Sequence, residues 1–174
     1  MKTRVFWARF FLVAALATAV MIFCFSAQQG PESAELSEGV TKEVAKVVKP
    51  NYKILPPAAQ RSFLMQLGAV VRKCAHFGEF ALLGFNIMAW LCLSRPDKSP
   101  AASAPPAWLA ATLYAGTDEL HQMFVNARGP ALLDVGIDSG GALTGVLAAL
   151  AGAALLAWFR QAAARRCAAS GELL

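Results

Sequence analysis

The residues of this chain that could carry chemistry lie in or beside apolar stretches. His76 and Glu79 form an H-x-x-E pair at i, i+3, and Asp118 precedes His121 by three residues. A carboxylate placed in hydrocarbon costs at least about 2.5 kcal/mol on insertion scales. Such groups must therefore face one another, water or a ligand rather than lipid. The residues of this kind are Glu79, Asp118, Glu119, Asp134 and Asp138, together with His76 and His121.

Basic and amide side chains beside these acids favour a binding site for an anion. Arginine and lysine form charge-assisted hydrogen bonds with phosphate oxygens, and carboxylates can orient those cations or bind sugar and peptide amides. The main hypothesis is recognition of an anionic lipid headgroup, such as that of a phospholipid. The ligand-binding candidates are Arg72, Lys73, Gln122, Arg128, Asp134 and Asp138.

The same region also allows an enzyme or a structural network. Neutral imidazole and carboxylate groups can bind a divalent metal, and a histidine beside an acid can serve as a general base. The reaction would be metal-dependent hydrolysis or transfer at a lipid phosphate, although no P-loop, HExxH or nucleophile-elbow motif is present. The candidates for both catalysis and metal binding are His76, Glu79, Asp118 and His121. The third hypothesis is a purely structural polar network in a scaffold or partner-binding membrane protein.

The composition predicts that membrane-embedded helices hold these groups. Of 174 residues, 57% are hydrophobic and only 16% are charged, against roughly 25% charged in ordinary soluble domains. This composition excludes a disordered chain, and the length suits one domain, over residues 1–174. The four cysteines form no CxxC pair, and the basic residues show no nucleic-acid-binding motif. The sequence does not indicate whether the protein is a monomer or an oligomer.

Four stretches have the length and apolarity of membrane spans. They cover about residues 10–25, 75–93, 107–124 and 132–159, the third opening after Pro105-Pro106. The first favours an uncleaved anchor over a signal peptide, because no clear small-x-small cleavage site follows it. We therefore predict an all-α integral membrane protein built as a four-helix bundle.

Basic residues beside the short loops predict the orientation. Lys2, Arg4 and Arg9 flank the first span, and Arg95 and Lys98 lie between the second and third. Further basic residues follow the fourth span. Because short cytoplasmic flanks are enriched in lysine and arginine, both termini are predicted to be cytoplasmic, in a bacterial inner membrane.

The segment between the first two spans, residues 26–73, has amphipathic character. Leu36, Val40, Val44 and Val47 repeat at helical spacing between charged residues, and prolines then interrupt the pattern. A second amphipathic stretch leads into the second span. Such a pattern is typical of a helix lying on a membrane surface, here the extracytoplasmic one.

The candidate residues are predicted to lie at the same depth in the membrane. Residues 72–79 open the second span, 118–122 close the third, and Asp134 and Asp138 open the fourth. Three helices therefore bring polar ends to the outer leaflet. Gly141 and Gly145 form a small-xxx-small pair, which allows another helix to approach the fourth span closely.

These residues also carry a resemblance to a known family. The stretches Arg72-Lys73-x-x-His76-Phe77-x-Glu79-Phe80 and Asp118-Glu119-x-His121-Gln122-x-Phe124-x-x-x-Arg128 resemble motifs of the VanZ-like family. Asp134, Asp138, Gly141 and Gly145 and the first span, which ends in Phe25-Ser26, are similar too. The resemblance extends from about residue 10 to 155. It implies a multi-span membrane protein of the bacterial cell envelope, and a link to lowered sensitivity to glycopeptide antibiotics such as teicoplanin. Under this resemblance, the anionic ligand could also be a polyprenyl-linked cell-wall precursor.

Overall fold

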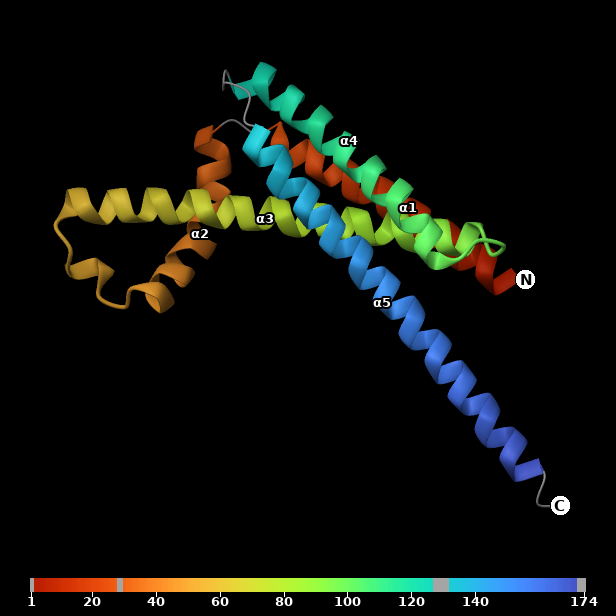
Figure 1. Ribbon diagram of the computed structural model, residues 1–174. Coiled ribbons are helices and arrows are strands. Elements are labelled where there is room, and N and C mark those ends of the chain that lie inside the picture. Colours follow the sequence, from red (N-terminus) through yellow and green to blue (C-terminus); the bar gives the residue numbers. More distant parts are fainter. Residues whose placement is uncertain (1, 28–29, 127–131, 172–174) are drawn as a thin grey trace.

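The computed structural model describes residues 2–27, 30–126 and 132–171, and every regular element in these ranges is helical (Figure 1). The prediction of an all-α protein is therefore confirmed. The elements are α1 (Lys2–Ser26), α2 (Gly30–Val48), the short 3-10 helix η1 (Tyr52–Ile54), α3 (Pro57–Ser94), α4 (Pro100–Asn126) and α5 (Leu132–Gly171).

Helix α3 is the element around which the others pack. It contacts α1, α2, α4 and α5, and α4 also contacts α1 and α5. Figure 1 shows α1 and α4 running in one direction and α3 and α5 in the other, while the C-terminal half of α5 leaves the group. We call the packed parts of α1, α3, α4 and α5 the helix core. The end of α1, the end of α4 and the start of α5 lie at one end of this core.

Both α3 and α4 begin earlier than the predicted spans. α3 begins at Pro57, within the segment predicted as a surface loop, because no helix-breaking residue separates residues 57–73 from the apolar stretch that follows. α4 begins at Pro100 rather than after Pro106. The amide of Ala102 donates to the hydroxyl of Ser99 at 3.3 Å, so Ser99 caps the helix and Pro100 takes the first helical position.

Three helices, α1, α3 and α5, are long and apolar enough to cross a membrane. α4 falls outside this set, although a third span was predicted at 107–124. Its mean hydropathy is lowered by the prolines of its first half and by its polar C-terminal part, in which Asp118 is buried and His121 is half-buried. Its exposed face is apolar nevertheless, with Trp108, Leu109, Leu113, Leu120 and Phe124.

α3 and α5 touch along their backbones. A Cβ on Gly141 would lie 2.3 Å from the carbonyl oxygen of Phe77, and one on Gly145 would lie 1.8 Å from that of Ala81. On the other side of the contact, a Cβ on Gly84 would lie 2.3 Å from the carbonyl oxygen of Ala142. The predicted close approach at Gly141 and Gly145 is confirmed, and its partner is α3.

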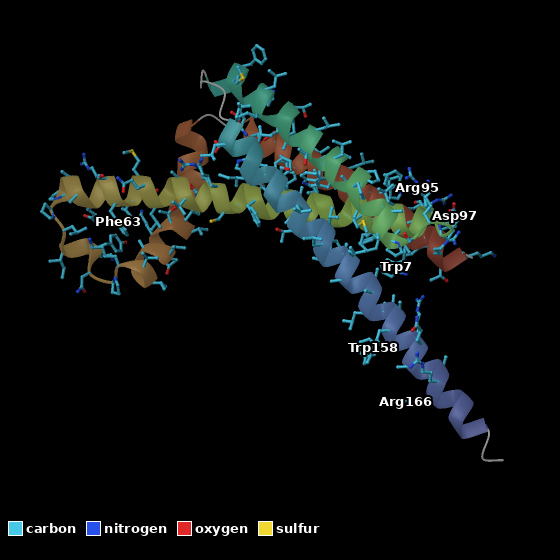
Figure 2. The ribbon with its side chains drawn as sticks, in the orientation of Figure 1. Trp7, Phe63, Arg95, Asp97, Trp158 and Arg166 are labelled. Atoms are coloured by element: carbon cyan, nitrogen blue, oxygen red, sulfur yellow. The ribbon has the colours of Figure 1, made fainter. Side chains whose placement is uncertain are left out.

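α2, η1 and the first half of α3 form a hairpin beyond the end of the helix core (Figure 1). α2 packs on α3 through Thr41 and Ala45, which are buried, while Val40 and Val47 of the predicted apolar stripe are exposed. Phe63 of α3 lies in this hairpin, with the ring of Tyr52 at 6.0 Å. Figure 2 places Phe63 far from Trp7, Arg95 and Asp97, which lie together at the opposite end of the molecule.

The close crossing gives a stability prediction. Gly145→Ala should destabilise the protein, because the added Cβ would force α5 away from the backbone of Ala81. Overpacking of this kind typically costs about 1–3 kcal/mol. The matched control is Gly152→Ala in the same helix, where a Cβ meets nothing within 4 Å. Thermal unfolding in detergent should give a lower melting temperature for Gly145→Ala only. Equal melting temperatures would contradict the backbone contact.

Candidate functional site

The crossing of α3 and α5 determines which polar residues meet. His76 immediately precedes Phe77, whose carbonyl faces Gly141, and Asp138 lies three residues before Gly141. The backbone contact therefore places one turn of α3 beside the first turns of α5. α4 packs against both helices, and it supplies Asp118.

His76, Asp118 and Asp138 form a compact group, which we call the polar cluster. Each offers one ligand atom, and these atoms all lie within 4.8 Å of one another. Asp118 is 3% exposed and Asp138 is 7% exposed, while His76 is half-buried. An imidazole and two carboxylates from three separate helices therefore meet at the end of the helix core where these helices were predicted to converge.

Hydrogen bonds from two helices hold Asp118 in place. Its Oδ2 accepts a hydrogen bond from the hydroxyl of Ser26 at 2.8 Å and another from Nε2 of Gln122 at 2.9 Å. Gln122 Nε2 also lies 3.3 Å from the Ser26 hydroxyl. The other oxygen, Oδ1, is buried and accepts no hydrogen bond from the part of the chain that the structure describes. Hydrogen bonds thus hold Asp118 through Oδ2, while Oδ1 can still accept a ligand.

Two further candidates lie beside the polar cluster. Glu79 is half-buried, and its Oε2 lies 3.8 Å from Nδ1 of His76, at ion-pair distance. His121 stacks on Phe23 of α1, with ring centroids 4.4 Å apart. Its Nε2 is buried and has no hydrogen-bond partner among the described residues. The structure therefore brings Asp138 into the group with His76 and Asp118, and places His121 against α1.

The predicted anion-binding cations are divided between two surfaces. Lys73 forms an ion pair with Asp134, which joins α3 to the first turn of α5. Both side chains are partly exposed, at 47% and 35%. Arg72 lies on the side of α3 that faces α2. A Cβ on Gly68 would lie 3.6 Å from Nη1 of Arg72 and equally far from the hydroxyl of Thr41 in α2, so both groups lie near Gly68. Arg128 lies outside the described residues.

Several polar contacts between helices involve residues outside the predicted site. Ser26 binds Asp118, and Asn86 of α3 donates to the hydroxyl of Thr18 in α1 at 3.4 Å. Tyr114 donates to the carbonyl of Ala19 at 2.6 Å. The depth of Ser26 was a usable signal, because it ends the first apolar stretch at the same level as Asp118. Thr18 and Asn86 gave no such signal, since each is a single polar residue within an apolar run.

The arrangement offers two kinds of chemistry. The buried acids and the imidazole can bind a cation or move a proton, because carboxylate and imidazole groups suit both tasks. Lys73, next to them on the exposed rim, can contact an anion. The buried carboxylates of Asp118 and Asp138 lie at one end of the helix core, and many of its exposed side chains are large and apolar.

The chain was compared with known proteins. The model of the VanZ/LLP1 family matches residues 11–157, most of the chain and all of the polar cluster. Searches of the curated proteins and of the solved structures found no match. The family match agrees with the resemblance of the motifs around His76, Asp118 and Asp138. The chain belongs to the VanZ/LLP1 family, and it is a VanZ-like protein with membrane-spanning helices.

Proposed function

We propose that this chain is a four-span protein of the bacterial inner membrane that binds an anionic lipid headgroup at the outer leaflet. The ligand is a phospholipid or a polyprenyl-linked wall precursor. The observation that carries the proposal is the juxtaposition of Lys73 with the polar cluster at one end of a helix core whose surface exposes many large apolar side chains. Such a site lies where a headgroup meets a bilayer surface.

The four-helix membrane bundle is supported by the surface of α4. The polar residues that lower the hydropathy of this helix are buried or half-buried, whereas Leu109, Leu113 and Leu120 are exposed. Lipid would cover this exposed face and would not meet Asp118. Because α4 also runs alongside α1 and packs on α3 and α5, it crosses the membrane with them.

The orientation follows from the ends of the helix core. Basic residues of the N-terminus and of the turn at Arg95 lie at the end opposite the polar cluster, as the position of Trp7 beside Arg95 in Figure 2 indicates. Basic flanks favour the cytoplasm. The polar cluster and the hairpin of α2 and α3 are then extracytoplasmic, and exposed Val40 and Val47 rest on the outer leaflet.

Headgroup binding requires a cation that can exchange its partner. Lys73 meets this requirement, because its ion pair with Asp134 is partly exposed, and exposed pairs contribute at most about 1 kcal/mol. A phosphate can therefore take the place of Asp134 at low cost. Arg128 follows α4 in the sequence and would add a guanidinium to the same phosphate. Binding of a wall precursor in this position would lower sensitivity to glycopeptide antibiotics.

A second candidate function is hydrolysis or transfer at a lipid phosphate. The observation that favours it is the proximity of the His76 imidazole to the carboxylates of Glu79, Asp118 and Asp138. Such an arrangement suits a general base oriented by an acid. Release of phosphate or of a headgroup from a defined lipid, lost in His76→Gln, would support this alternative over binding alone.

Cysteine accessibility tests the topology. With the native cysteines replaced by serine, single variants Lys53→Cys, Lys98→Cys and Arg165→Cys are treated with a membrane-impermeant maleimide in intact spheroplasts. We expect labelling at position 53 only, and labelling of the other two after permeabilisation. Labelling at 165 with protection at 98 would mean that α4 does not cross the membrane. Labelling at 98 with protection at 53 would reverse the orientation.

Lipid retention tests the binding proposal. Native mass spectrometry of the gently solubilised wild-type protein should show one anionic lipid at near-unit ratio. Lys73→Gln should reduce this retention at least fivefold, or about 1 kcal/mol, because the phosphate loses a charge-assisted hydrogen bond. The matched control is Lys46→Gln, since Lys46 also pairs with an acid, Glu43, but lies on α2. Equal retention in the two variants would contradict the proposal.

A further inference from the structure

The polar cluster has the ligand set of a transition-metal site. His76 comes from α3, Asp118 from α4 and Asp138 from α5, and one ligand atom of each lies within 4.8 Å of the others. Metal–ligand bonds of about 2.0–2.2 Å give ligand-to-ligand distances of about 3–4.5 Å around one ion. The three groups are therefore close enough for small side-chain movements to place them around one metal.

Asp118 provides an independent observation that points to a cation. Its carboxylate is almost completely buried, and Oδ2 already accepts hydrogen bonds from Ser26 and Gln122. Oδ1 is buried as well and receives no donor from the described residues. A buried acceptor without a partner is costly, and a carboxylate oxygen is a good metal ligand. A bound cation would satisfy this oxygen.

The charge balance of the polar cluster leads to the same conclusion. Asp118 and Asp138 place two carboxylates among apolar helices, and Glu79 lies near His76. Buried carboxylates repel one another unless a positive charge or a proton compensates them. The neighbouring ammonium group of Lys73 pairs with Asp134. A divalent ion between Asp118 and Asp138 would supply the compensating charge within the cluster.

We propose that His76, Asp118 and Asp138 bind one divalent first-row transition-metal ion. The imidazole favours an ion such as Zn²⁺ over Ca²⁺ and Mg²⁺, which prefer ligand sets made only of oxygen, and the two carboxylates also suit Mn²⁺. Three protein ligands leave at least one coordination position for water or a phosphate oxygen. Glu79 Oε2 lies 3.8 Å from Nδ1 of His76, and a small side-chain movement would let it accept a hydrogen bond that orients the imidazole. The role of the metal in holding a lipid phosphate rests on the proposed function, whereas metal binding itself does not.

The test is metal titration of the full-length protein, purified without a polyhistidine tag and stripped with a chelator. Wild-type protein should bind Mn²⁺ or Zn²⁺ at one ion per chain, and the melting temperature should rise with the metal. Asp138→Asn should weaken binding at least tenfold and abolish this rise. The matched control is Asp134→Asn, one turn away on α5 and paired with Lys73, which should bind metal like the wild type.

Several outcomes would overturn the inference. Wild-type protein that binds neither ion would exclude the site. Equal loss of metal affinity in Asp134→Asn and Asp138→Asn would mean that the metal is attracted to acidic side chains in general, without a defined site. His76→Gln gives a second reading if Asp138→Asn fails to fold, because it should also weaken binding at least tenfold. Lys73→Gln separates the two proposals, since it should lose the lipid and keep the metal. Lipid retention without metal binding would refute only this inference.

Discussion

The backbone contact between α3 and α5 determines where the polar side chains of the helix core meet. Gly141 and Gly145 present no side chain to α3, so the carbonyls of Phe77 and Ala81 reach the surface of α5. Small residues allow this approach between membrane helices, where packing replaces the hydrophobic effect as the driving force. Because Asp138 lies one turn before Gly141, the same contact fixes its position beside α3 and next to His76.

A second consequence concerns how the polar groups are distributed around each helix. α4 carries Asp118, His121 and Gln122 on its inner side, and its outer side is apolar. Mean hydropathy averages over both sides and therefore does not record this separation. Hydrogen bonds from Ser26 and Gln122 to Asp118, and from Tyr114 to α1, replace the water that these groups give up.

Much of this arrangement could be predicted from the sequence, and the exceptions have physical causes. The positions of the polar residues at the ends of the apolar stretches predicted that three helices meet there. The spacing of Gly141 and Gly145 predicted the close contact. The rotation of α4 about its axis was not predictable from spacing, so Asp138 rather than His121 completes the group with His76 and Asp118. The sequence also indicated an amphipathic stretch that leads into the second span. The structure joins both in the single helix α3, because no proline separates them.

The α3–α5 crossing places His76 and Asp138 in one interacting group. A double-mutant cycle measures this most directly, with His76→Gln, Asp138→Asn and the double variant compared by their thermal unfolding. Groups more than about 7–10 Å apart give additive effects within about 0.5 kcal/mol, whereas groups in contact show coupling of about 0.5–3 kcal/mol. We predict clear coupling between these two substitutions. Additive effects would contradict an interaction between His76 and Asp138, because they would mean that the two helices do not bring these side chains together.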